Sequence, residues 1–138
     1  MIDETFALRY ELARAAFDRG EFIEASRTLE DLMMDLQSEQ TDPTGEADPT
    51  HTPDGSRAQV THGTSELRLL LARAYYHSAA LSRAERVLDQ LVVDEPTDGY
   101  ARLLLARTLQ RQGRATEATP QLAIAAALGQ DVSSAQRG

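Results

Sequence analysis

Apolar and small residues recur at helical spacing in three stretches of the chain, and each stretch holds two such stripes around a polar turn. The first stretch, residues 6–39, carries the stripes Leu8, Leu12, Ala13, Ala16 and Phe22, Ala25, Leu29, Leu32. Steps of three and four residues place these side chains on one face of an α-helix. Between the stripes lies Asp18-Arg19-Gly20-Glu21, where Gly20 can end a helix because glycine tolerates positive φ. The pattern predicts a helix hairpin.

Two later stretches, residues 65–98 and 99–132, repeat this hairpin. Their stripes are Leu67, Leu71, Ala72, Tyr75 and Leu81, Ala84, Leu88, Leu91, then Ala101, Leu105, Ala106, Leu109 and Ala115, Ala118, Leu122, Ala125. Leu12 recurs as Leu71 and again as Leu105. Leu71 and Leu105 are one repeat period apart, and Leu12 and Leu71 are separated by the same period plus an insertion as long as segment 40–64. A 34-residue period predicts an all-α fold, an α-α superhelix of three stacked helix-turn-helix repeats.

Residues 40–64 differ in kind from the three repeats. They carry the turn signals Asp42-Pro43, Asp48-Pro49 and Pro53-Asp54-Gly55, and Val60 is their one large aliphatic residue. So little apolar surface cannot offset an ordering cost of roughly 1–2 kcal/mol per residue, so we predict a flexible polar linker. Closing this longer loop costs only about 1.6 kcal/mol more than closing a short one. We therefore expect the first repeat to dock on the second within one domain, with domain swapping as the alternative. A polar tail follows at 133–138.

The repeats resemble the tetratricopeptide repeat (TPR) family. Its pattern is matched by Leu12, Ala13, Ala16, Gly20, Phe22, Ala25 and Leu29, and again by Leu71, Ala72, Tyr75, Leu81, Ala84, Leu88 and Pro96. The resemblance covers residues 6–39 and 65–132, about three-quarters of the chain. It implies a right-handed superhelix with a groove lined by the first helix of each repeat. It also implies protein–protein interaction as the class of function, without naming a partner.

The sequence departs from this pattern at three positions. Ala115 stands where an aromatic residue is usual, and Ala79 replaces the turn glycine. If position 79 has positive φ, the alanine costs on the order of 1 kcal/mol. Pro120 falls inside the last predicted helix. We expect that helix either to start late, capped by Thr116, or to kink at the proline.

Small residues are expected to set the distance between helices. Each first helix carries an alanine beside a leucine, and each second helix carries one on its inner face: Ala13, Ala72, Ala106 and Ala25, Ala84, Ala118. Small side chains allow two helix axes to approach to about 8–9 Å. Enlarging one of them, as in Ala84→Leu, is predicted to overpack the middle repeat.

Charge and composition exclude several classes of function. The net charge is −8 with no basic patch, which disfavours a nucleic-acid partner. There is no cysteine, and no apolar run is long enough for a membrane-spanning helix, so we expect no disulfide and no membrane partner. The acidic N-terminus lacks signal-peptide blocks, and we expect a cytoplasmic protein. All 14 basic residues are Arg, which we attribute to the codon bias of a GC-rich bacterial genome.

Candidate binding residues lie on the face of each first helix opposite its packing stripe. They are Tyr10, Arg14, Phe17, Leu69, Arg73, Tyr76, His77, Leu103, Arg107 and Gln110. Three arginines would then form a ladder able to bind carboxylates of a peptide, beside aromatic side chains that offer apolar area. The alternative is that these arginines are solvated or paired locally, as Arg14 with Glu11. The Lys and Asn residues with which chaperone-binding TPR proteins grip a C-terminal carboxylate are absent.

No catalytic, metal or cofactor site is expected. The chain lacks a cysteine nucleophile, a glycine-rich phosphate loop and a zinc-binding histidine pair. His51 and His62 lie near Asp42, Asp48 and Asp54, but without a known metal-binding spacing, and we interpret them as solvated. His77 is better explained by a helix C-terminus or by the groove.

The last helix favours a second class of function. Residues 121–128 are apolar nearly all round, and Ile124 and Leu128 stay outside the packing stripe. An uncovered apolar patch indicates a partner surface, and we expect self-association, as a homodimer, through this helix. The sequence therefore predicts a small non-enzymatic adaptor or scaffold that binds a peptide or protein segment. The alternative is a homo-oligomeric structural element with no peptide ligand.

Overall fold

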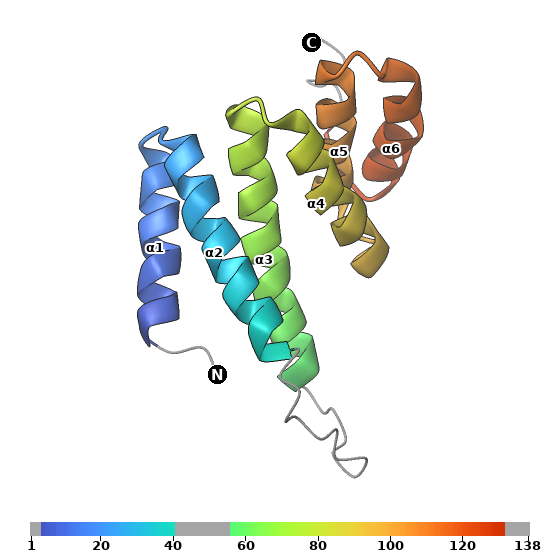
Figure 1. Cartoon of the computed structure of the whole chain (residues 1–138). Helices are drawn as coiled ribbons and strands as arrows, with labels where there is room; N and C mark the ends of the chain where they lie inside the picture. Colours follow the sequence, from blue (N-terminus) through green and yellow to red (C-terminus); the bar gives the residue numbers. More distant parts are fainter. Residues whose placement is uncertain (1–3, 41–55, 132–138) are drawn as a thin grey trace.

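The computed structural model describes the backbone of residues 4–40 and 56–131, and the side chains of residues 4–38 and 64–131. This part of the chain forms six helices: α1 (Glu4–Asp18), α2 (Phe22–Gln40), α3 (Ser56–His77), α4 (Leu81–Asp94), α5 (Gly99–Arg111) and α6 (Ala115–Ala127). They follow one another across the molecule as three hairpins, and each second helix also packs on the first helix of the next hairpin (Figure 1). The described residues contain no strand. The all-α repeat architecture predicted from the 34-residue period is confirmed.

Two helices are longer than the period predicts. α2 has 19 residues and α3 has 22, against 13 to 15 for the other four. The expected linker at 40–64 is therefore wrong at both ends, because Gln40 ends α2 and residues 56–64 are the first turns of α3. Residue types such as Arg, Ala and Gln, which stand at 57–59, favour helix without needing burial, and this propensity outweighs the low apolar content on which the linker prediction rests there. Figure 1 shows the C-terminal end of α2 beside the first turns of α3, which extend beyond the other helices.

Some of the predicted features lie outside the described residues. They are the turn signals and His51 within 41–55, the side chain of His62, and the polar tail at 133–138.

The small residues of the repeat lie in the core, as predicted. Ala25, Ala84 and Ala118 are fully buried, and so are Ala72 and Ala106. Large leucines fill the space around them. One cluster joins the first hairpin to the second, and another joins the second to the third. The core therefore continues across both junctions between successive hairpins, as expected for a repeat protein.

Only half of the predicted packing stripe of α1 is buried. Ala13 and Ala16 are buried, but Leu8 and Leu12, which were expected in the core, are 61% and 58% exposed. Their counterparts on α3, Leu67 and Leu71, are buried because they face α2, the second helix of the preceding hairpin. No helix of the described chain precedes α1, so the same stripe has nothing to pack on there.

The turns between the paired helices share one backbone conformation. φ is +84° at Gly20, +64° at Ala79 and +79° at Gly113. Ala79 therefore meets the condition under which alanine in place of the turn glycine is costly. Of the two alternatives for the last helix, the late start is wrong: α6 begins at Ala115, so Thr116 does not cap it and Pro120 lies inside it. Pro120 is solvent-exposed in the second turn of α6, where it removes the hydrogen bond that an N–H at this position would donate to the Thr116 carbonyl oxygen.

An ion pair repeats between the helices of the first two hairpins. Arg9 Nη1 donates to Asp35 Oδ2 at 2.7 Å, and at the corresponding positions of the second hairpin Arg68 Nη1 donates to Asp94 Oδ2 at the same distance. In the third hairpin the acid is replaced by Leu128, and Arg102 donates instead to the Gln121 amide oxygen at 3.1 Å. None of the described helices is both long and apolar enough to cross a membrane.

Candidate functional site

Four aromatic rings and two arginines meet where α1, α3 and α5 end and α2 begins. We call this group the arginine–aromatic cluster; its members are Phe17, Phe22, Arg73, Tyr76, His77 and Arg111. Phe17 comes from the last turn of α1, and Phe22 is the first residue of α2. The cluster therefore draws side chains from all three hairpins, because hairpins in register bring their turns to the same end of the stack.

The rings of the cluster contact one another in favourable geometries. His77 stacks on Phe22 with ring centroids 4.7 Å apart and an interplanar angle of 21°. Phe17 meets Phe22 edge to face at 5.1 Å, and Tyr76 meets His77 edge to face at 5.5 Å. Offset-stacked and edge-to-face pairs are the preferred arrangements of aromatic rings. The four rings thus form a connected aromatic shelf.

Both arginines lie on this shelf. The Arg73 guanidinium carbon lies 4.7 Å from the centroid of the Phe17 ring, and that of Arg111 lies 4.6 Å from the centroid of Tyr76. Arg111 Nη1 also donates to the Tyr76 carbonyl oxygen at 2.6 Å, near the negative end of α3. Cation–π contact orients each guanidinium while leaving donors free for a ligand. Through these contacts with Tyr76, Arg111 also connects the third hairpin to the second.

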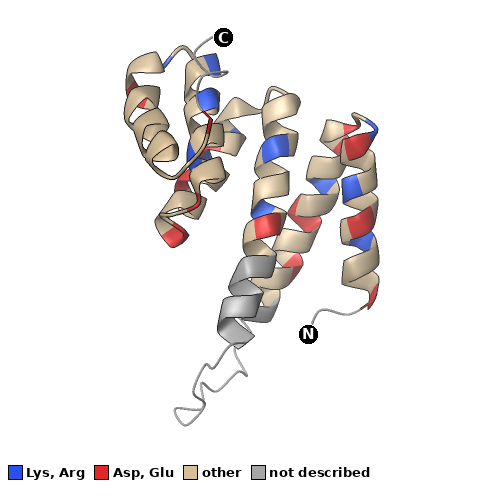
Figure 2. Ribbon diagram, turned by 180° about the vertical axis from the view of Figure 1, so that it is seen from behind, with Lys and Arg blue, Asp and Glu red and all other residues tan. Residues whose placement is uncertain are grey.

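The cluster carries an excess of positive charge. Burial lowers the pKa of His77, and the positive charges of Arg73 and Arg111 lower it further. Within residues 4–38 and 64–131, no carboxylate forms an ion pair with Arg73 or Arg111. Acidic and basic positions are otherwise interspersed on α1, α2 and α3 (Figure 2). The chemistry on offer is recognition of an anion beside an apolar or aromatic group.

The structure brings together four of the ten residues predicted to bind a partner: Phe17, Arg73, Tyr76 and His77. Of the others, Tyr10 and Leu69 pack half-buried against the core, and Leu103 is buried against Ala125. Burial raises the pKa of Tyr10, and the nearby Glu66 carboxylate adds to this. Leu103 therefore belongs to the core of the last hairpin and not to an open surface.

The three ladder arginines differ in their surroundings. Arg14 is exposed, and its Nη1 lies 3.7 Å from Glu11 Oε1, the local pairing given as the alternative. Arg107 is half-buried and already has an interaction partner, and Gln110 is half-buried. Only Arg73 of the three lies in the arginine–aromatic cluster.

Sequence reasoning missed Phe22 and Arg111 as members of this site. The helical spacing places Phe22 in a packing stripe, and α5 taken by itself does not mark Arg111 as a binding residue. A signal was present: Arg111 lies one repeat period after His77, so both occupy the same position of the repeat. Reading the ends of the helices across repeats, instead of each helix by itself, would have placed them together.

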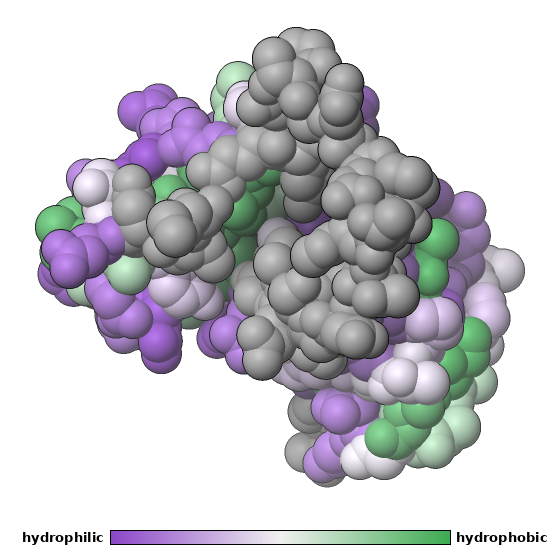
Figure 3. Space-filling model, turned by 90° about the horizontal axis from the view of Figure 1, so that it is seen from below, coloured by the Kyte–Doolittle hydropathy of each residue, from purple (hydrophilic) through white to green (hydrophobic). Residues whose placement is uncertain are grey.

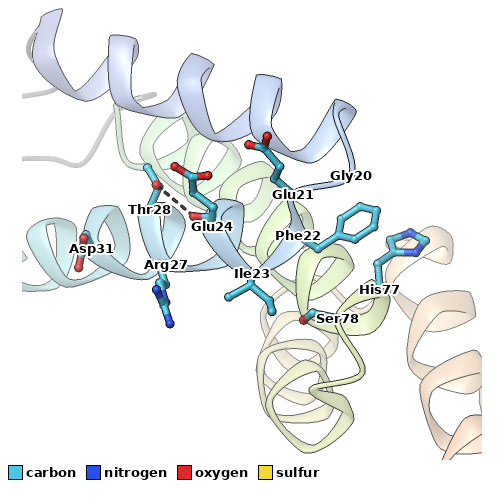
Figure 4. A pocket seen from close by; sticks show the side chains of 10 residues that line it. All are labelled: Gly20, Glu21, Phe22, Ile23, Glu24, Arg27, Thr28, Asp31, His77 and Ser78. Atoms are coloured by element: carbon cyan, nitrogen blue, oxygen red, sulfur yellow. Dashed lines mark hydrogen bonds between the residues drawn. The ribbon is translucent and has the colours of Figure 1, made fainter.

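A pocket of about 750 Å³ adjoins the cluster. Its wall includes Phe22 and His77, which lie side by side at one end, and continues along the outer face of α2 to Asp31 (Figure 4). Other lining residues are the acids Glu21 and Glu24 and the base Arg27. Arg19 donates to Glu21 and holds the pKa of that carboxyl below its usual range. Because acids outnumber bases here, an anionic partner is better matched by the cluster than by the pocket.

Neither the family models nor the curated proteins compared with this chain give a match.

Proposed function

We propose that this chain is a non-enzymatic protein-interaction module that binds an acidic peptide segment at the arginine–aromatic cluster. The observation that carries the proposal is the placing of Arg73 and Arg111 on aromatic rings, with no carboxylate partner among the described residues. Three stacked hairpins and the TPR resemblance of the sequence support a binding role. A partner on this surface would contact the ends of α1, α3 and α5 at once.

The chemistry of the cluster specifies the kind of segment. A guanidinium donates two parallel hydrogen bonds to a carboxylate, and such charge-assisted bonds are stronger than neutral ones. The neighbouring rings offer apolar area for an aromatic or aliphatic side chain next to the acid. Both arginines are held by cation–π contact before any ligand arrives, which reduces the entropy lost on binding. We therefore expect Asp or Glu next to a large apolar residue in the partner.

Fluorescence anisotropy with a library of labelled octapeptides, varied in Asp/Glu and aromatic positions, tests this proposal. The double variant Arg73→Glu/Arg111→Glu should weaken the tightest peptide by at least about tenfold, since two charge-assisted contacts become repulsive. Arg86→Glu is the matched control, because Arg86 is exposed on α4 and is not a member of the cluster. Binding should also strengthen as the pH falls, because a bound carboxylate favours the protonated form of His77. Equal affinity in the double variant and the control would exclude the site.

A self-assembling structural element is the second candidate. It is favoured by the exposure of Ile124 and Leu128 on α6, which are 37% and 36% exposed. Purification with native partners separates the two candidates: a co-purifying protein supports the adaptor, and a clean homo-oligomer supports the structural element.

A further inference from the structure

The same junction between hairpins occurs twice in this chain. α2 packs on α3, and α4 packs on α5, each time joining the second helix of one hairpin to the first helix of the next. Every junction therefore has a first-helix half and a second-helix half. Because the hairpins share one register, the corresponding positions on α1 and α6 can be read directly from the sequence.

The first-helix half is exposed on α1. On α3 it consists of Leu67, Leu70, Leu71 and Ala74, and on α5 of Ala101, Leu104, Leu105 and Thr108, all of them buried. The positions that correspond on α1 are Leu8, Glu11, Leu12 and Ala15. Of these, Leu8 and Leu12 are large apolar side chains left more than half exposed. Leucines in this register are buried wherever the chain supplies a preceding second helix.

The second-helix half is exposed on α6. Contacts define this half on the other two helices. Glu30 of α2 accepts a hydrogen bond from the Tyr75 hydroxyl of α3. Glu85 of α4 accepts one at 2.8 Å from Nη1 of Arg114, which lies in the turn that follows α5, and Val92 of α4 joins the cluster around Leu105. On α6 the same repeat positions are occupied by Ala123 (for Glu30), Thr119 (for Glu85) and Ala126 (for Val92). All three are exposed.

The two exposed halves complement each other in size. α1 presents leucines, whereas α6 presents alanines and a threonine, and small residues let a second helix approach closely. Figure 3 shows hydrophobic atoms on both flanks of the molecule, on the side of α1 and on the side of α4 to α6. Glu117 is the one charged residue within α6. The exposed half of that helix therefore places no charged side chain against the apolar stripe of α1. Glu11 occupies the repeat position of Leu70 and Leu104, and its Oε1 lies 3.7 Å from Nη1 of Arg14 on the same helix.

We infer that copies of this chain stack head to tail, with α1 of one copy on α6 of the next, in the geometry of α3 on α2 and of α5 on α4. Such a junction is heterologous: the two contacting surfaces differ, so each added copy leaves one end of each kind free, and copies add in a line until the rotation between them closes a ring. It is weaker than the internal junctions, because Ala126 replaces Met33 and Val92 and because Glu11 replaces a leucine. Association should therefore depend on protein concentration.

Sedimentation equilibrium over a concentration series tests the stacking with two variants. Leu12→Arg blocks the α1 end, and Ala126→Arg blocks the α6 end. Both sites are exposed, so the fold should be retained, as circular dichroism can verify. The native chain should show an average mass that keeps rising with concentration. Each variant alone should stay monomeric. Their equimolar mixture should form a one-to-one dimer and nothing larger, since one intact end remains on each partner.

Two exposed sites outside the stacking halves serve as controls: Met34→Arg on α2 and Ala127→Arg on α6 should associate like the native chain. A native chain that is monomeric at every concentration would overturn the inference. So would a dimer that is abolished by one end variant and untouched by the other, because that result means a symmetric α1–α1 or α6–α6 contact. Peptide binding does not enter these measurements, so the two proposals can fail separately.

Discussion

The turn between the paired helices shows how one residue conformation is kept across the chain with different side chains. Gly20, Ala79 and Gly113 all have positive φ, which an L-residue with a Cβ adopts only at a cost of about 1–2 kcal/mol. The period identified position 79 as the turn residue, and the structure shows its strain. The middle hairpin thus stores strain that the other two avoid.

Ala79→Gly should stabilise the protein by about 0.5–1 kcal/mol. Glycine removes the Cβ penalty at positive φ, and its larger unfolded-state entropy offsets part of the gain. Gly113→Ala is the mirror experiment: a Cβ there meets no atom within 4 Å, so any loss reflects conformation alone. Urea denaturation measures both. The explanation fails if Ala79→Gly destabilises the chain.

His77 should make stability depend on pH. Its pKa is lowered by burial and by Arg73 and Arg111, so the unfolded chain binds this proton more tightly than the folded chain does. The stability contribution is therefore present in full above the ordinary histidine pKa of about 6.5 and is lost as the pH falls through the lower folded value. His77→Phe keeps a ring against Phe22 but cannot titrate. The native chain should lose free energy of unfolding relative to this variant between about pH 7 and pH 5. Parallel curves for the two proteins would contradict the assignment.

At the scale of the elements, the ion pair between paired helices occurs in two environments. The Arg68 side chain is only 12% exposed, whereas Arg9 and Asp35 are more open to solvent. The hydrogen bond from Arg68 lowers the pKa of Asp94, and a second one from Gln90 adds to this. The contribution of Asp94 is therefore present above the usual carboxyl pKa and is lost as the pH falls through its lower folded value.

Asp94→Ala should cost more than Asp35→Ala. The first leaves the guanidinium of Arg68 largely buried without its carboxylate, at about 1–3 kcal/mol. The second removes an exposed pair worth about 0–1 kcal/mol. Thermal denaturation of both variants, repeated at high salt, measures the difference. Equal losses would mean that burial of Arg68 does not strengthen the pair.

Across the whole molecule, the sequence predicted the features that depend on the repeat period and missed those that depend on which helices lie next to each other. The alanines of the repeat were placed correctly because close packing is set by helical spacing and side-chain size. Leu8 and Leu12 fit the same pattern, yet their burial needs a preceding helix that the pattern cannot supply. Residues 56–64 contain little apolar surface, so only their helix propensity could have indicated that α3 starts at Ser56. The arginine–aromatic cluster and the repeated ion pair join residues far apart in the chain. They become visible only when the three copies are compared position by position.

The middle hairpin offers a test of the stack as one cooperative unit. Ala84 of α4 is fully buried in the cluster that joins the first two hairpins, and α4 also packs on α5. Ala84→Leu should overpack this junction and cost roughly 1–3 kcal/mol. Because each hairpin is stabilised by its neighbours, the loss should lower the midpoint of one single transition and not split it in two. Ala7→Leu on the exposed face of α1 is the control and should leave the midpoint nearly unchanged. Calorimetry measures the midpoints of both variants. An unchanged midpoint for Ala84→Leu would show that close packing of the helices does not depend on a small residue at this position.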